Sequence, residues 1–256
     1  MPELNIVLIF GSAPDVTEIR QWDLSVFANC IAINNAWKAT PHWDYLIFPE
    51  DFPIEKHPQL IAGTHQKLIT AAEFVPVQNN YGGFIYAGGT MSFTAGYWAL
   101  GALKPDIIAY LGCDMVYSTD LGKSSHFYGE GSADPLRDDM TLQSLEAKSN
   151  RFMALANKQQ CAVYNMSTLP DSRLTFPRQT LAGLQQLESH DHILLAQQQL
   201  FDLHKVNLAL AAEEELGYWV PSGRYWESDQ QFDPKQLRKI DDIWIHAAVK
   251  STKVLK

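Results

Sequence analysis

The sequence predicts an α/β fold, in which a mainly parallel β-sheet carries helices on both faces and is followed by a C-terminal helical appendage. In the first two-thirds of the 256 residues, short apolar runs alternate with helical patterns, as in repeated βαβ units. Ile and Val dominate several of these runs, which is typical of strands covered on both faces. After residue 176 no strand-like run is evident, and only three of the 15 glycines remain. We therefore expect a domain at 1–176 and a lid or oligomerisation element at 177–256.

The expected elements follow from apolar periodicity and from cap residues. The clearest strands cover 5–10, 30–34, 45–48, 107–111 and 161–164, and weaker ones cover 67–70 and 83–86. Helices are expected at 90–103 and 141–159, and another begins near Thr17. In the appendage we expect one or two helices within 181–216 and a further helix over 234–250. The acidic run Glu213-Glu214-Glu215 is expected to be a solvated helix face.

Composition restricts the class of protein. The net charge of −9 argues against general nucleic-acid binding, because neutralising phosphates requires clustered Lys and Arg. No apolar run approaches the roughly 18 to 20 residues of a membrane span, and 5–10 is too short for a secretory signal. The three cysteines lie in or beside apolar runs without metal-like spacing, which predicts reduced core thiols. We therefore expect a cytoplasmic protein.

Small or amide-bearing residues follow four or five of the predicted strands. Because the carboxyl ends of parallel strands meet at one edge, where open α/β sheets bind ligands, these residues predict a binding site. For each motif alone, a tight turn or an Asx turn is the alternative interpretation. Two glycines before a Thr cap also suit an anion at a helix start. The candidate binding residues are Gly11, Ser12, Asn34, Asn35, Gly89, Thr90, Asn165 and Ser167.

The richest stretch runs from 107 to 136, where a buried strand is followed by a polar, glycine-rich segment. Asp114, at the strand end, could orient a ligand hydroxyl, act as a base or bind a metal. His126 could be an acid or base near neutral pH. Tyr128 and Glu130 could hold a phosphate-bearing or sugar ligand, or exchange a proton with it. This mixture of side chains predicts a ligand site rather than a packing core.

Across residues 5–168 the order of motifs resembles the bacterial sialyltransferase clan that uses CMP-sialic acid, together with its Rossmann-like relatives. Those relatives are the motility-accessory proteins and the 6-hydroxymethylpterin diphosphokinase-like family. The resemblance implies a Rossmann-like domain with Gly11, Ser12 and Asn34 or Asn35 at the nucleotide. It also implies that a His of the loop that contains residues 125–129, called the late loop below, is the general base. The motifs are Ile9-Phe10-Gly11-Ser12-Ala13-Pro14, Ala32-Ile33-Asn34-Asn35, Gly88-Gly89-Thr90, Tyr110-Leu111-Gly112-Cys113-Asp114, Ser125-His126-Phe127-Tyr128-Gly129 and Asn165-Met166-Ser167.

The sequence departs from that clan at two places. The first loop, which begins at Gly11, lacks the Asn of the clan's G-N-G-P-S-like loop. In the late loop the clan's catalytic His is the second of an S-H-Y-x-G-H pattern, and Glu130 occupies that position. The base is therefore Glu130, His126 or absent.

These observations leave three hypotheses open. The first is a glycosyltransferase that uses a nucleotide-activated sugar, with a CMP-sugar favoured, to modify a glycan acceptor in surface-polysaccharide synthesis. The second is a diphosphokinase-like phosphotransferase, which needs Mg²⁺ and therefore the convergence of Asp114 with Glu130 or Asp134. The third is a non-catalytic sugar-nucleotide-binding protein. No resident cofactor is predicted under the first hypothesis. A homo-oligomer could form through the aromatic loop near Trp219 and Trp226.

Overall fold

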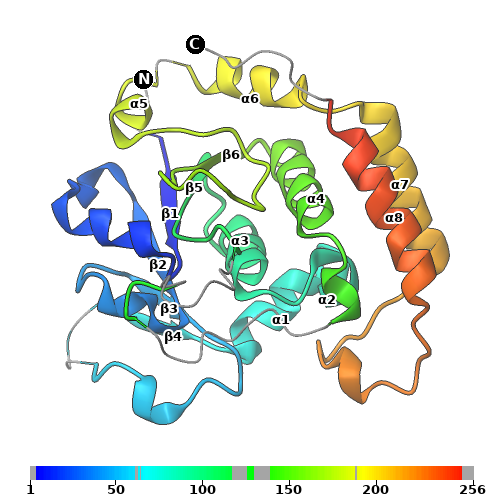
Figure 1. Ribbon diagram of the computed structural model, residues 1–256, viewed down its shortest axis with the longest axis horizontal. Helices are drawn as coiled ribbons and strands as arrows, with labels where there is room; N and C mark the ends of the chain where they lie inside the picture. The colour runs from blue at the N-terminus through cyan, green and yellow to red at the C-terminus, as the bar shows by residue number, and fades with distance from the viewer. Residues whose placement is uncertain are drawn as a thin grey trace.

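The computed structural model describes residues 4–60, 63, 65–116, 126–129, 139–187 and 189–249. Within them, the chain forms a six-stranded sheet in the order β4-β3-β2-β1-β5-β6, and every pairing is parallel (Figure 1). The α/β, Rossmann-like fold is therefore confirmed. The strands are β1 Ile6–Phe10, β2 Asn29–Ile33, β3 Tyr45–Ile47, β4 Lys67–Ile69, β5 Ile107–Leu111 and β6 Ala162–Asn165.

The order of the strands reverses between β1 and β5. Strands β2, β3 and β4 extend the sheet on one side of β1, whereas β5 and β6 extend it on the other. Phe10 pairs with Leu111 at the end of this central ladder, so the loops after both strands begin side by side. Connections that leave in opposite directions open a crevice between the two carboxyl ends, and ligands of open α/β sheets bind in such a crevice.

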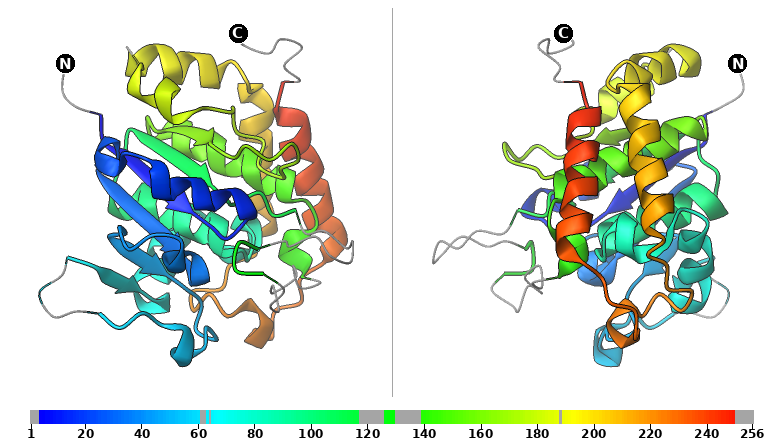
Figure 2. Two further views of the ribbon diagram at one scale, coloured as in Figure 1. Left: turned by 60° about the vertical axis from the view of Figure 1, so that its left-hand side comes forward. Right: turned by 90° about the vertical axis from the view of Figure 1, so that its right-hand side faces the viewer.

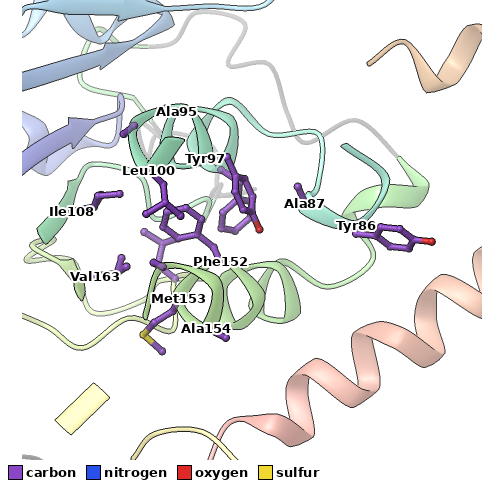
Figure 3. Close-up of a cluster of buried hydrophobic side chains, with 14 of the residues drawn as sticks. Tyr86, Ala87, Ala95, Tyr97, Leu100, Ile108, Phe152, Met153, Ala154 and Val163 are labelled. Atoms are coloured by element: carbon purple, nitrogen blue, oxygen red, sulfur yellow. The ribbon is translucent and has the colours of Figure 1, made fainter. Parts of the chain in front are cut away.

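Helices cover both faces of the sheet, as predicted. One face packs against α1, α3 and α4, and Figure 3 shows side chains of α3 and α4 meeting Ile108 and Val163 of the sheet. The other face packs against the 3₁₀ helix η1 (Pro14–Gln21) and against α5 and α6. The α-helices are α1 Ala71–Asn79, α2 Gly83–Ala87, α3 Met91–Ala102, α4 Leu145–Lys158, α5 Leu181–Gln185, α6 His190–Gln198, α7 Leu203–Leu216 and α8 Pro234–Ala247.

Helix α3 lies very close to the sheet because Gly96 has no side chain. A Cβ at this position would lie 2.7 Å from Cζ of Phe152 and would also overlap the hydroxyl of Tyr110. Contacts this short do not occur for real Cβ atoms, so the helix would have to shift. Gly96 thus sets the spacing between α3, α4 and β5.

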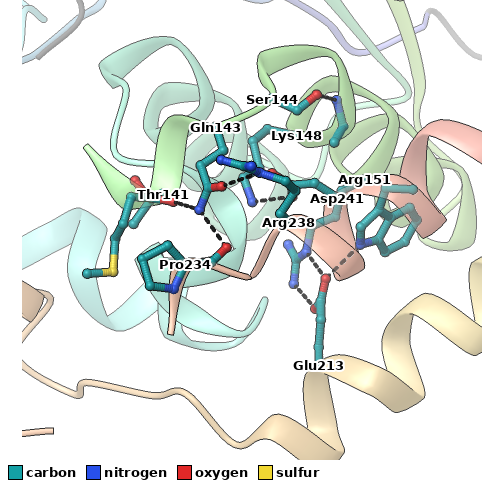
Figure 4. Close-up of polar contacts among 12 residues, drawn as sticks. Thr141, Gln143, Ser144, Lys148, Arg151, Glu213, Pro234, Arg238 and Asp241 are labelled. Atoms are coloured by element: carbon teal, nitrogen blue, oxygen red, sulfur yellow. Dashed lines mark hydrogen bonds and ion pairs between the residues drawn. The ribbon is translucent and has the colours of Figure 1, made fainter. Parts of the chain in front are cut away.

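The C-terminal helices share the hydrophobic core of the sheet domain. Figures 1 and 2 show α7 and α8 side by side along the outer side of α4. Trp244 of α8 is fully buried in the same cluster as the sheet residues. Two buried ion pairs join these helices to α4, one between Lys148 and Asp241 and one between Arg151 and Glu213 (Figure 4). The boundary near residue 176 stays a prediction.

Most element predictions are confirmed, and the exceptions have physical reasons. The six predicted strands other than 83–86 match β1 to β6 within one residue at each end. The strand prediction at 83–86 is wrong, because this stretch is helix α2, bracketed by Gly82 and Gly88 at φ 87° and 86°. A short buried apolar run does not by itself distinguish a helix from a strand.

The C-terminal region also differs from expectation. Residues 181–216 form three helices rather than one or two, because Ser189 and Asp202 each cap a new helix with their side-chain oxygens. The prediction that Glu213 lies on a solvated face is wrong as well, since its side chain is buried. None of the helices in the described part of the chain has the length and apolarity that crossing a bilayer requires. The cytoplasmic location and the homo-oligomer stay predictions.

Candidate functional site

The carboxyl ends of β1 and β5 are held tightly together. The N–H of Gly11 donates to the carbonyl of Leu111 at 2.8 Å, and the N–H of Ala13 donates to that of Gly112 at 3.0 Å. A Cβ on Gly11 would lie 2.8 Å from Sγ of Cys113, so this close approach requires glycine. The N–H groups of Gly11 and Ala13 are therefore not available to a phosphate in this conformation.

Asp114 is the first side chain at this edge whose polar atoms have no hydrogen-bond partner among the described residues. It follows β5, only 1% of its surface is exposed, and neither carboxylate oxygen has a hydrogen-bond partner among the described residues. Its own carbonyl accepts from the N–H of Arg173 at 2.9 Å, which fixes the backbone. Burying a carboxylate without partners is energetically costly. A bound ligand is the simplest source of the missing partners.

Asp15, in the first turn of η1, forms the second carboxylate of this edge, and the sequence analysis did not assign it to the site. Its Oδ2 accepts from the N–H of Thr168 at 3.1 Å, and Ser167 provides a further hydrogen bond. Its Oδ1 is buried without a partner among the described residues. Burial raises the pKa of Asp15 above its usual range, and the nearby charge of Asp114 adds to the shift.

Cys113 directly precedes Asp114, and its Sγ lies against the backbone of Gly11. Burial raises the pKa of its thiol most, and the charges of Asp114 and Asp15 raise it further. The thiol is therefore protonated at neutral pH, in agreement with the prediction of a core cysteine. Both carboxylates therefore act on this one thiol at the end of β5.

The late loop lies against the loop that follows β1. The N–H of Phe127 donates to the carbonyl of Ser12 at 3.0 Å, and the Tyr128 hydroxyl hydrogen-bonds the side chains of Ser12 and Asn35. Burial raises the pKa of Tyr128 more than these hydrogen bonds lower it, so the phenol stays protonated. The structure thus brings together three predicted site residues from three separate segments.

His126 is the candidate base of this loop. It is buried, its ring centroid lies 5.1 Å from that of Tyr128, and burial lowers its pKa below the usual range. The imidazole is therefore neutral at pH 7 and able to accept a proton. Glu130, the alternative base, lies outside the described residues, as does Asp134.

Asn34 and Asn35 follow β2 at the same edge. Asn34 adopts φ 50°, the left-handed region that Asn tolerates better than most residues. The Oδ1 atoms of both residues are buried and have no hydrogen-bond partner among the described residues. Two amide oxygens are thus placed to accept hydrogen bonds from a ligand.

Three other predicted residues use their polar groups within the protein. The N–H of Gly89 donates to Oγ1 of Thr141 at 3.0 Å, and Oγ1 of Thr90 accepts from the N–H of Phe93 at 3.3 Å as the cap of α3. Oδ1 of Asn165 accepts from the N–H of Ser167 at 2.9 Å, and its Nδ2 donates to Ser172. Their contact with a nucleotide stays a prediction.

Comparison with models of known protein families, with curated proteins and with solved structures gave no match. The chemistry of the site thus follows from its own groups: carboxylate and amide oxygens that accept hydrogen bonds, and a neutral imidazole beside them. Within the described residues, no group of three or more His, Cys, Asp or Glu side chains could hold a metal ion. A cation at this edge would need ligands from a bound molecule as well.

Proposed function

We propose that this protein is a glycosyltransferase that takes a sugar from a nucleotide-activated donor, with a CMP-sugar favoured, and transfers it to a glycan acceptor. The observation that carries this proposal is the buried Asp114 carboxylate, which has no hydrogen-bond partner among the described residues and lies where the strand order reverses. The resemblance of the motif order to the sialyltransferase clan supports the same assignment.

In this mechanism the acceptor hydroxyl attacks the anomeric carbon of the donor sugar. His126 accepts the hydroxyl proton, which its lowered pKa permits at neutral pH. The bond between the anomeric carbon and the phosphate oxygen breaks, and the nucleotide leaves with the electron pair. Hydroxyl and amino groups of the nucleotide-sugar supply hydrogen bonds to the Oδ1 atoms of Asn34 and Asn35, which have no partner among the described residues.

Nucleotide binding is the first test. CMP, CMP-sugars and UDP-sugars at millimolar concentration are compared by thermal shift on the wild-type chain. A ligand at 100 times its Kd stabilises by about 2.7 kcal/mol, which raises Tm by roughly 5 to 10 °C for a chain of this size. If none of these nucleotides raises Tm, the proposed function is wrong.

The His126→Gln variant tests the role of the base. It should still bind the nucleotide, whereas donor hydrolysis or transfer should fall roughly 10²- to 10⁴-fold. Asp191→Asn, at an exposed position of α6, is the matched control and should change neither property. Unchanged turnover by His126→Gln would assign the proton transfer to another group.

The pair Asp15 and Asp114 favours a second candidate, the Mg²⁺-dependent diphosphokinase-like phosphotransferase. Such an enzyme needs carboxylates that hold Mg²⁺ against the phosphates of ATP. It would release AMP from ATP in the presence of a hydroxylated acceptor, and it would do so only with Mg²⁺. Release of CMP from a CMP-sugar without AMP formation from ATP would decide for the glycosyltransferase.

A further inference from the structure

Five buried side-chain oxygens near the carboxyl ends of β1, β2 and β5 are acceptors that have no hydrogen-bond partner among the described residues. They are both carboxylate oxygens of Asp114, Oδ1 of Asp15, and the Oδ1 atoms of Asn34 and Asn35. Within the described residues, neither Asp15 nor Asp114 forms an ion pair with Lys, Arg or His. A bare phosphate placed against these carboxylates would be repelled rather than bound.

We propose that Asp15 and Asp114 bind one divalent, oxygen-preferring cation, such as Mg²⁺ or Mn²⁺, at the carboxyl ends of β1 and β5, and that this cation holds the phosphate of the nucleotide. The phosphate part rests on the proposed function, whereas the cation part rests on the two carboxylates. The cation supplies a positive charge that no described residue offers to these two buried carboxylates, and it turns a repulsive contact with phosphate into an attractive one.

The backbone holds Asp15 and Asp114 on two loops that are joined side by side. The N–H of Ala13 donates to the carbonyl of Gly112 at 3.0 Å, and each carboxylate lies two residues beyond one end of that bond. The fixed position of Asp15 Oδ2, which accepts from Thr168, leaves Oδ1 for a ligand. Asp114 offers both of its oxygens, and it is the more deeply buried of the two.

Two carboxylates are enough for this type of cation. Mg²⁺ is usually held by one or two carboxylates together with waters and the phosphates of the substrate, rather than by an all-protein cage. This agrees with the lack, among the described residues, of any larger group of metal-ligating side chains. It also implies that the cation and the nucleotide bind cooperatively, since each completes the site of the other.

The test measures Mn²⁺ binding by the loss of the free-ion EPR signal, with the protein alone and with saturating CMP or UDP. We expect one Mn²⁺ per chain, with an affinity that either nucleotide increases roughly tenfold or more and that Mg²⁺ competes for. Asp114→Asn and Asp15→Asn should each weaken Mn²⁺ binding by about tenfold or more. Asp191→Asn, which removes an exposed carboxylate of α6, should not.

A measurement on the wild-type chain keeps the test independent of how the variants fold. Bound Mn²⁺ should broaden the amide NMR signals of Ala13 and Gly112 and leave those of α8 sharp. Broadening elsewhere, or none, overturns the cation site.

The outcomes separate this inference from the proposed function. Nucleotide binding that is equally tight in EDTA overturns the inference and leaves the proposed function standing. Mn²⁺ binding that depends on Asp114 but is indifferent to CMP and UDP overturns the phosphate bridge and supports the cation site alone. The proposed function is overturned separately, by the absence of a Tm shift with every nucleotide.

Discussion

The buried ion pair between α4 and α7 yields the sharpest prediction about stability, for the substitution Glu213→Gln. Oε1 of Glu213 accepts from Nε of Arg151 and from Nε1 of Trp244, both at 2.8 Å, and Oε2 accepts from Nη2 of Arg151 at 2.8 Å. The side chains of Arg151 and Glu213 are only 2% and 7% exposed. The amide of Gln has nearly the same shape but turns one acceptor into a donor and removes the charge.

The size of the effect follows from what is left behind. A buried ion pair with one partner removed costs about 3 to 5 kcal/mol, because the remaining charge has no compensation. Burial lowers the pKa of Arg151, but the charges of Glu213 and Tyr97 and the hydrogen bonds to both together raise it more, so the guanidinium stays protonated in the native protein. The variant should therefore lose about 3 kcal/mol or more of unfolding free energy, which lowers Tm by roughly 6 to 12 °C.

Urea denaturation followed by far-UV circular dichroism measures this loss. Glu50→Gln is the matched control, because Glu50 forms a two-pronged pair with Arg224 in which both side chains are about half exposed. An exposed pair contributes about 0 to 1 kcal/mol. A loss in Glu213→Gln that is no larger than in Glu50→Gln would refute the reasoning that this pair locks α7 onto α4.

Three further predictions concern the core and the site. Gly96→Ala should lower the unfolding free energy by about 1 to 3 kcal/mol in urea, because its Cβ would crowd Phe152; a loss below about 0.5 kcal/mol contradicts this. Burial holds the pKa of folded His126 below its unfolded value of about 6.5, so stability should fall as pH drops below that value, and less steeply in His126→Gln. If the unfolding free energies of the wild type and of His126→Gln change equally with pH between 8 and 5, this prediction is wrong. Asp114→Asn should raise the unfolding free energy of the ligand-free chain by about 1 to 2 kcal/mol, because it removes a buried carboxylate that has no partner among the described residues; destabilisation would argue against that cost.

The sheet could be predicted from the sequence because each strand carries its own local signal. Runs such as Ile107–Leu111 are apolar, rich in β-branched residues and bounded by turn residues, and they match the observed strands. The segment Gly83–Ala87 has the same apolar character but is a helix. Most of its residues are buried, so its composition shows no helical periodicity that would distinguish it from a strand. Whether a short buried apolar run becomes a helix or a strand depends on tertiary contacts, and the local sequence pattern does not contain that information.

The sequence predicts only those site residues that lie close to the end of a strand. Asp114 and Asn35 follow β5 and β2 within three residues, so a parallel sheet places them at one edge. Asp15 could not be assigned to the site from the sequence, because its partners, Ser167 and Thr168, lie about 150 residues away along the chain. The signal that could have found it is an Asp in the first turn of the helix after β1, beside the predicted crevice.

The appendage shows the same limit. Leucine spacing predicts helices, but Glu213 looks like one of three solvated acidic residues in the sequence. Its burial depends on Arg151, which lies on a different helix 62 residues away. A buried charge is recognised from its partner, and sequence spacing does not reveal a partner at that distance.

The way this chain treats buried charge argues that Asp114 has a function. Glu213 is compensated by Arg151, and Asp241 is compensated by Lys148 at 2.7 Å, so the fold supplies a cation where a carboxylate only supports packing. Asp114 is more deeply buried than either acid, yet neither of its oxygens has a partner among the described residues. A neutral side chain of the same size would fill the same space at lower free energy. The charge of Asp114 is therefore best explained by something that binds it, and its position at the end of β5 is where a parallel sheet accommodates a ligand.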